Sequence, residues 1–333
     1  MDAETPREGR YEVVIIGGGA AGLSGALTLA RARRSVLVID GGRPRNALAA
    51  HAHGFLTRDG APPAEILAAG RAEATGYGAE IVRATVRTVT PLGGPEGGED
   101  AEAGFLVTLA EGAAVRARRL LVATGLVDEL PDIPGLADRW GREVLHCPYC
   151  HGWEVRDQPI AVLARHPALA VDQALLWRQW SPSVTVLSHT APAFDEADLR
   201  LLAARGIGVT PGTVARVETA EGGLRGVTLA DGTHVPCRAL VVTPLLTARA
   251  EPLAGLGLRA EEVVRDGVVL GSEVPSDFTG RTAVPGVWVA GNVASVTEQL
   301  VAAASAGQRA GAAVNMDLIK AEAAQALAME GAA

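Results

Sequence analysis

Residues 12–40 read EVVIIGGGAAGLSGALTLARARRSVLVID, and this stretch decides the fold. An apolar run over 12–16 predicts a short buried strand, and a second apolar run over 35–39 predicts another. Between them, a glycine-rich turn leads into a stretch of helical composition over 23–33. Asp40 follows the second strand directly. This order of strand, glycine turn, helix and strand predicts one β-α-β unit of the dinucleotide-binding type.

The turn carries the spacing Gly-x-Gly-x-x-Gly at Gly17, Gly19 and Gly22, with Ala20 and Ala21 between the last two glycines. We expect the first glycine to permit a tight turn, the second to let a pyrophosphate approach the backbone, and the third to let helix and strand pack closely. The N-terminus of the helix then faces the phosphates, and the acid after the second strand can accept from ribose hydroxyls. The pattern predicts a bound dinucleotide and does not separate FAD from NAD.

Length and composition limit the possible functions. The chain has 333 residues, 48% of them hydrophobic, which suggests two domains with full apolar cores. Its net charge of −8 argues against nucleic acid as a partner, because phosphate backbones need a basic surface. The apolar run 13–30 lacks the basic flank of a signal peptide, and no run reaches the ~18 apolar residues of a membrane span. We therefore expect a cytoplasmic protein that does not enter a membrane.

A second domain is predicted to be inserted into the first. The strand-helix-strand order recurs over 159–163, 168–180 and 184–188. Near the C-terminus, a strand over 287–290 precedes a long helical stretch that starts at Val301. A Gly/Glu-rich turn from Gly93 to Gly104 indicates a hairpin tip, and the Pro-rich passage 131–135 indicates a crossover between domains.

The predicted fold class is therefore α/β, with two Rossmann-like three-layer domains. We expect one domain to be discontinuous, formed by residues 1–126 and 245–333, and to bind the dinucleotide. The inserted domain would span residues 127–244.

Two cysteines lie two residues apart in the stretch His146-Cys147-Pro148-Tyr149-Cys150-His151. Such a pair can close a small disulfide ring and pass two electrons, and the flanking histidines are bases that can take up a thiol proton near neutral pH. Half a zinc site and a purely structural disulfide are the alternatives, but no second Cys-x-x-Cys completes a set of four ligands, so we expect no metal. The third cysteine, Cys237, lies in an apolar run and is expected to be buried by packing.

Two further stretches complete a specific order of motifs. Ala123-Thr124-Gly125 follows a predicted strand, and residues 287–292 read VWVAGN. Together with the glycine fingerprint and the Cys-x-x-Cys of the middle domain, this order resembles the low-molecular-weight thioredoxin reductases, which are FAD-dependent pyridine nucleotide-disulfide oxidoreductases. The resemblance spans nearly the whole chain, and it implies bound FAD and a homodimer.

The resemblance also implies roles for single residues. The cofactor would be held by Gly17, Gly19, Ala20, Ala21, Gly22, Asp40, Arg45, His53, Ala123, Gly291, Asn292 and Gln299. Asn292 stands where members of the family usually have Asp, and Gln299 matches the position that lies against the isoalloxazine ring. Cys150 would face the flavin and Cys147 would meet the substrate. His151, in place of the usual Asp, and His146 are the candidate bases.

The glycine turn with which a thioredoxin reductase binds NADPH is missing. The strand 160–163 runs into Ala164-Arg165-His166-Pro167-Ala168, which contains no glycine and includes a proline without an N–H. The next strand ends at Ser188-His189, with no arginine pair for a 2′-phosphate. We therefore expect productive NADPH binding to be lost and electrons to enter from thiols.

With this absence, the chain resembles the flavin-dependent dithiol oxidases of gliotoxin and holomycin biosynthesis, which share the Cys-x-x-Cys-His-Gly motif found at 147–152. The resemblance implies disulfide closure in a small-molecule dithiol, with O2 taking the electrons. Tyr149, Trp153 and Trp140 are either core residues or walls of an apolar substrate pocket. Two other interpretations stay open. One is a disulfide reductase driven by NADPH or another donor, and the other is a flavin-bound redox sensor whose dithiol switches a partner interface.

Overall fold

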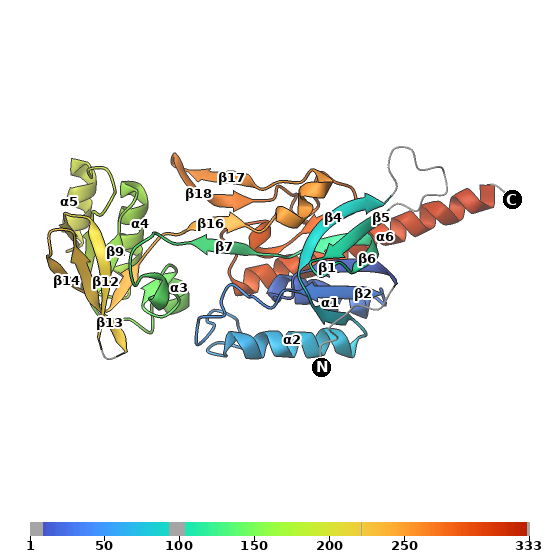
Figure 1. Ribbon diagram of the computed structural model, residues 1–333, viewed down its shortest axis with the longest axis horizontal. Helices are drawn as coiled ribbons and strands as arrows, with labels where there is room; N and C mark the ends of the chain where they lie inside the picture. Colours follow the sequence, from blue (N-terminus) through green and yellow to red (C-terminus); the bar gives the residue numbers. More distant parts are fainter. Residues whose placement is uncertain (1–8, 93–103, 221, 332–333) are drawn as a thin grey trace.

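The computed structural model describes residues 9–92, 104–220 and 222–331. Two sheet-based parts lie next to each other along the long axis of the molecule, and two strands run between them (Figure 1). The predicted hairpin tip from Gly93 to Gly104 falls almost wholly outside the described residues.

The first part is built on a seven-stranded sheet in the order β3-β2-β1-β6-β5-β4, with β19 pairing with β6. Its strands are β1 (Arg10–Ile16), β2 (Val36–Asp40), β3 (Glu80–Arg83), β4 (Val86–Leu92), β5 (Gly104–Leu109), β6 (Ala114–Val122) and β19 (Val287–Val289). Strand β6 is long enough for two neighbours on one edge, because Phe105 pairs with Ala117 and Val287 pairs with Leu120. The run β3-β2-β1-β6-β19 is parallel, so both ends of the chain build one Rossmann-like sheet.

Three helices belong to this part: α1 (Ala20–Arg31), α2 (Pro63–Gly76) and α6 (Leu300–Gly331). Val13 and Ile15 pack in a core with residues of α1 and α6, while Val14 and Ile16 pack in the core on the other face of the sheet. A parallel strand that is buried on both faces requires an unbroken apolar run, which explains the sequence of β1. The C-terminal end of α6 extends beyond the body of the molecule (Figure 1). The exposed Lys320, the one lysine of the chain, lies earlier on this helix, two residues after the buried Leu318.

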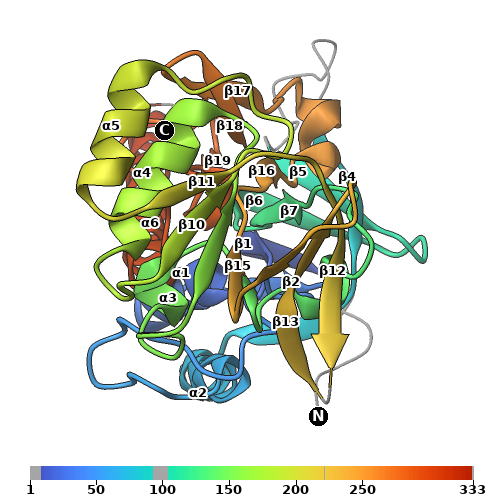
Figure 2. The ribbon, with the colours of Figure 1, turned by 90° about the vertical axis from the view of Figure 1, so that its left-hand side faces the viewer.

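The second part has five parallel strands in the order β11-β10-β9-β15-β8. They are β8 (Val144–Leu145), β9 (Ile160–Leu163), β10 (Val184–Leu187), β11 (Gly208–Thr210) and β15 (Ala239–Val241). In Figure 2, α4 (Pro167–Trp177) and α5 (Glu196–Ala204) lie on one side of this sheet, and the antiparallel strands β12 (Val214–Ala220) and β13 (Gly223–Leu229) lie on the other. Strand β14 (His234–Pro236) continues this ribbon. Cys237 is only 2% exposed in the core beneath it, which confirms the packing prediction.

Two antiparallel strands connect the parts: β7 (Leu126–Glu129) and β16 (Leu245–Ala248). The hairpin of β17 (Glu261–Arg265) and β18 (Val268–Glu273) extends them into a four-stranded sheet. Short helices complete the chain: α3 (Pro148–His151) and the 3-10 turns η1 (Ala137–Arg139), η2 (Glu251–Leu256) and η3 (Gly291–Val293). The predicted α/β class with Rossmann-like layers is confirmed, while the exact domain boundaries remain a prediction.

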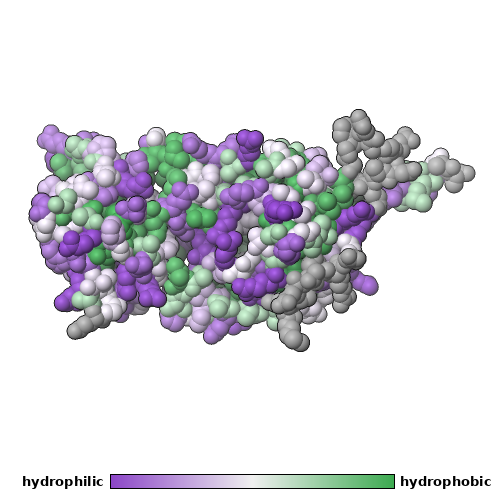
Figure 3. Space-filling view, in the orientation of Figure 1, coloured by the Kyte–Doolittle hydropathy of each residue, from purple (hydrophilic) through white to green (hydrophobic). Residues whose placement is uncertain are grey.

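Two helix boundaries differ from the prediction. The helix expected from residue 23 already begins at Ala20, because the last part of the glycine fingerprint forms its first turn. The helix expected to reach Trp180 ends at Trp177, and the chain turns over the next three residues. None of the helices in the described part of the chain is long and apolar enough to cross a membrane. On the face seen in Figure 3, hydrophilic and hydrophobic residues are intermixed.

The packing of α6 against α1 depends on a glycine. A Cβ at Gly307 of α6 would collide with the backbone of Ala21 in α1. We expect Gly307→Ala to lower the free energy of unfolding by about 1–3 kcal/mol, because neither backbone can move without disturbing the core. The measurement is denaturant unfolding of the flavin-loaded protein. Gly76→Ala is the control, since a Cβ there has open space, and equal effects of the two changes would contradict this account of the packing.

Candidate active site

The glycine turn is built as the predicted roles require. Gly17 has a positive φ of 114°, and a Cβ there would collide with the carbonyl of Ala123 on the neighbouring strand end. A Cβ at Gly22 would collide with the carbonyl of Gly17, so the first turn of α1 can approach β1 only without a side chain. At Gly19, the N-cap of α1, a Cβ would have open space, and no side chain caps the helix. The backbone N–H groups at this helix end can therefore face a pyrophosphate.

Asp40 stands at the end of β2 beside this turn. Its Oδ1 accepts from the backbone N–H of Gly42 at 2.8 Å, and its Oδ2 lies 3.0 Å from Nη2 of Arg71 in α2. The carboxylate is thereby held over the glycine turn, where it can accept from a ribose. No signal in the sequence pointed to Arg71, because the contact joins residues from two separate elements.

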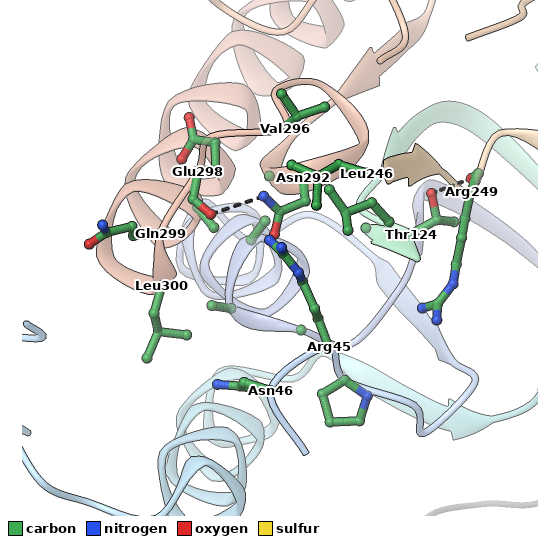
Figure 4. A pocket seen from close by; sticks show the side chains of 18 of the residues that line it. Arg45, Asn46, Thr124, Leu246, Arg249, Asn292, Val296, Glu298, Gln299 and Leu300 are labelled. Carbon is green, nitrogen blue, oxygen red and sulfur yellow. Dashed lines mark hydrogen bonds between the residues drawn. The ribbon is translucent and has the colours of Figure 1, made fainter. Parts of the chain in front are cut away.

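Ala123, Gly291, Asn292 and Gln299 come together where β6 and β19 end side by side. The Nδ2 of Asn292 donates to the backbone carbonyl of Glu298 at 2.9 Å (Figure 4). It also donates to the backbone carbonyl of Ser295 at 3.2 Å. These bonds hold the turn that precedes α6 and leave Oδ1 as the group that can accept from a hydroxyl. The side-chain amide thus replaces the acidic residue of the family without losing the acceptor.

One cavity of about 910 Å³ runs from the glycine turn to the cysteine pair. Among the residues predicted for the site it is lined by Gly17, Gly19, Ala20, Ala21, Asp40, Arg45, His53, Ala123, His146, Cys147, Cys150, His151, Gly291, Asn292 and Gln299. Gly22 does not line it, since it serves the packing of α1 on β1. The donors and glycines of this cavity fit the phosphates and sugars of FAD, and the pair of thiols lies at its other end.

The two thiols lie at the start of α3. Cys147 is the N-cap residue, Pro148 takes the first helical position, and the Sγ atoms of Cys147 and Cys150 are 2.8 Å apart. The Sγ of Cys147 also lies 3.9 Å from Nε2 of Gln299. Because a disulfide needs about 2.05 Å between the sulfur atoms, the pair can close with a small movement. Which thiol faces the flavin remains a prediction.

The surroundings of the two thiols shift their pKa values in opposite directions. The Cys150 thiol donates to Cys147, and this bond, helped by backbone N–H groups of α3 and by the Arg45 charge, lowers the pKa of Cys147 to about 7 against its burial. The same bond and burial raise the pKa of Cys150. Cys147 is therefore the thiolate near neutral pH, and thiolates are the reactive form.

The two flanking histidines differ in their surroundings. Nδ1 of His146 lies 3.2 Å from the carbonyl of Val242, and burial lowers the pKa of this imidazole. Neither ring nitrogen of His151 has a hydrogen-bond partner within the described residues, and both nitrogens are buried. Burial lowers the pKa of His151 as well, while the carboxylate of Glu154 opposes this effect. Of the two, His151 has the free nitrogens that a base requires.

Arg45 and His53 reach the cavity from the loop after β2, but each has a protein partner. Arg45 forms two bonds of 2.6 and 2.9 Å with the carboxylate of Asp128 in β7. The ring of His53 lies 3.4 Å from Asp59 on one side and 3.4 Å from Glu154 on the other. Contact with the cofactor remains a prediction for both. No pattern in the sequence indicated Asp128 or Glu154.

The three aromatic residues near the dithiol differ in burial: two are exposed and one is half-buried. Tyr149 is 62% exposed and Trp153 is 65% exposed, with the Arg156 guanidinium 4.2 Å from the Trp153 ring centre. The core interpretation is wrong for these two, because Tyr149 on α3 and Trp153 in the turn after α3 both face solvent. Trp140 is half-buried and lines the cavity together with Tyr149. No group of three metal-binding side chains occurs in the ranges that the structure covers.

We expect Cys150→Ala to raise the pKa of Cys147 by about one unit, because the strongest stabilising bond of the thiolate is removed. Alkylation of reduced protein by iodoacetamide, followed by mass spectrometry, gives the pH at which Cys147 becomes reactive. In the unchanged protein we expect this midpoint near pH 7. Cys150→Ser keeps a hydroxyl donor and should retain most of the shift. Identical midpoints for the Ala and Ser variants would contradict the assigned cause.

Comparison with known proteins agrees with this geometry. The pyridine nucleotide-disulphide oxidoreductase family matches residues 11–307. "Thioredoxin reductase sirT" of Leptosphaeria maculans is 30% identical over 325 residues, covering 94% of this chain and 95% of that protein. The crystal structure of HlmI aligns with a TM-score of 0.88 and 43% identity, covering 99% of each chain. An oxidoreductase from Agrobacterium tumefaciens aligns with a TM-score of 0.84 and 34% identity, over 93% of this chain and 99% of that one.

These matches confirm the resemblance to thioredoxin reductases, including the gliotoxin and holomycin group. They also confirm FAD as the cofactor, and the residues of the cavity fit it. The chain belongs to the pyridine nucleotide-disulphide oxidoreductase family and is a thioredoxin-reductase-like flavoprotein enzyme.

Proposed function

We propose that this protein is an FAD-dependent dithiol oxidase, which closes a disulfide in a small-molecule dithiol through Cys147 and Cys150 and passes the electrons to O2. One observation carries the proposal: the dithiol opens into the FAD cavity, while the second Rossmann unit lacks the features that bind a nicotinamide dinucleotide.

The second unit has a crevice where such a ligand would bind. In a parallel sheet, ligands bind beyond the carboxyl ends of the strands at the point where the strand order reverses. That point lies between β9 and β15. The cavity there measures about 320 Å³ and is lined by Arg165, His166, Pro244 and the hairpin residues 267–269, among others.

The turn between β9 and α4 does not suit a pyrophosphate. It contains no glycine, and Pro167 occupies the start of α4, where a backbone N–H would face the phosphate. The crevice has about a third of the volume of the FAD cavity. Both features favour electron entry from thiols over entry from NADPH.

The dithiol chemistry follows from the two acidities. A substrate thiolate attacks Sγ of Cys147 in the oxidised pair, which forms a mixed disulfide with Cys147, breaks the Cys147–Cys150 bond and releases Cys150 as a thiolate. His151 accepts the proton of the second substrate thiol, which then attacks the first substrate sulfur and releases Cys147. Departure of Cys147 is favoured because its low pKa makes it a good leaving group.

The substrate loses two electrons and two protons in these steps, and the cysteine pair gains the electrons. Bound FAD supplies the two-electron acceptor for the reduced pair and the route to O2. The balance is one dithiol and one O2 consumed for one disulfide and one H2O2 formed.

A disulfide reductase is the second candidate. The name of the sirT relative favours it, as do the exposed Tyr149 and Trp153, which could meet a protein partner beside the dithiol. The homodimer implied by the resemblance and the cytoplasmic location expected from the sequence remain predictions.

The two candidates separate in an anaerobic titration of the yellow protein followed at the flavin absorption band. We expect dithiothreitol to bleach the flavin and NADPH to leave it oxidised, because only thiols can deliver electrons. Admission of O2 should restore the colour and yield H2O2. Bleaching by NADPH at a rate similar to that by dithiothreitol would overturn the proposal in favour of the reductase.

Cysteine variants test the path of the electrons. We expect Cys147→Ser and Cys150→Ser to slow bleaching by dithiothreitol by about 100-fold or more, since each removes the disulfide that accepts electrons from the substrate. Cys237→Ala is the matched control, because its thiol is buried away from the pair, and it should bleach like the unchanged protein. The measurement is the stopped-flow rate of flavin bleaching.

A further inference from the structure

Glu154 is a charged residue near the dithiol to which the proposed reaction gives no role. It lies three residues after His151, in the turns that follow α3. Its Oε1 is 3.4 Å from Nε2 of His53, which belongs to the loop after β2. This contact joins the segment of the dithiol to the part of the chain that holds the dinucleotide.

The loop on the other side of this contact is ordered by its own bonds. Nδ1 of His53 lies 3.4 Å from Oδ2 of Asp59, and Oδ1 of Asp59 accepts from the backbone N–H of Gly54 at 2.8 Å. A β-bridge between Ala52 and Ala61 closes the loop at its base. These bonds hold the loop, and so they hold Nε2 of His53 toward Glu154.

His151 is the group that this arrangement can serve. Its ring nitrogens are buried and unpartnered among the described residues, and it lines the same cavity as His53 and the thiols. An imidazole that accepts a proton in such a place becomes a buried cation, which is costly without a nearby negative charge. Burial lowers the pKa of His151, the Glu154 carboxylate from its own segment raises it, and the charge of His53 from the loop lowers it. The backbone of Cys147 raises this pKa as well, by a smaller effect. Arg45 from the same loop acts on the neighbouring thiols.

We propose that Glu154 is a positioning residue for the dithiol reaction: clasped to His53, its carboxylate stabilises the protonated form of His151. The inference rests on the proposed function, in which His151 takes the proton of the second substrate thiol. It adds a residue that touches neither substrate nor flavin but sets the basicity of the residue that takes the proton. No covalent change occurs at Glu154.

The test is the titration of His151 in the flavin-loaded protein. Glu154→Gln keeps the size of the side chain and removes its charge, so the pKa of His151 should fall by roughly half a unit, as expected for one partly exposed carboxylate. NMR of protein labelled with ¹⁵N-histidine measures this directly, with the signal assigned by its loss in His151→Asn. In stopped-flow bleaching by dithiothreitol, the rise of the rate with pH should move to lower pH by the same amount.

Two variants make the test specific. Asp157→Asn removes another carboxylate from the same segment. Within the described structure, this carboxylate forms no ion pair with an imidazole. Asparagine tolerates the positive φ of 62° at this position. It should leave both titrations unchanged, while Glu154→Asp should restore most of the shift. A His151 titration that is the same in Glu154→Gln and in the unchanged protein would overturn the proposal, and so would a titration that moves without the bleaching profile. Failure of the proposed function looks different, since then NADPH bleaches the flavin of the unchanged protein as fast as dithiothreitol does, whatever the titration of His151.

Discussion

The antiparallel pairing of β7 with β16 is the constraint on which the site depends. Each Rossmann-like unit is complete in itself, with its own sheet and its own cores. The pairing of Leu246 with Asp128 and of its neighbours fixes how the two units face each other. In this orientation the dithiol, which follows β8 of the second sheet, opens into the cavity that begins at the glycine turn of the first. The Arg45–Asp128 ion pair acts at the same place, because Asp128 lies on the connecting strand and Arg45 on the loop beside the cavity.

Burial and hydrogen bonding give chemically identical side chains at the site different acidities and different roles. The pKa values of two thiols separated by two residues shift in opposite directions, because one thiol donates to the other and the start of the helix favours the acceptor. Two histidines on either side of them also differ, since one is bonded to the carbonyl of Val242 and the other has no bond within the described residues. The differences between the two thiols and between the two histidines therefore arise from the short helix α3 and its position beside the edge strand β8, not from differences in residue type.

The elements that the sequence predicted well are those with a local cause. The glycine fingerprint, the apolar strands on either side of it and the missing glycine turn before α4 are properties of short stretches, and the structure has them where expected. The partners of the site residues could not be predicted in this way. Arg71, Asp128 and Glu154 reach Asp40, Arg45 and His53 from distant elements, and no period or spacing links them. The exposure of Trp153 could not be predicted for a related reason, because the burial of a side chain in a turn depends on which distant elements pack against that turn.

The scarcity of lysine gives α6 a practical property. Lys320 is exposed on α6, at a point where the helix still packs on the body, since Leu318 is buried and Glu322 pairs with Arg34. The C-terminal end of α6 lies on the opposite side of the molecule from the dithiol helix α3 (Figure 1). Reagents that acylate side-chain amines therefore have a single target, remote from the cavity. A dye, a biotin or a solid support attached there would hold every molecule in the same orientation, with the mouth of the cavity free. Arginine elsewhere carries the positive charge without offering a second point of attachment.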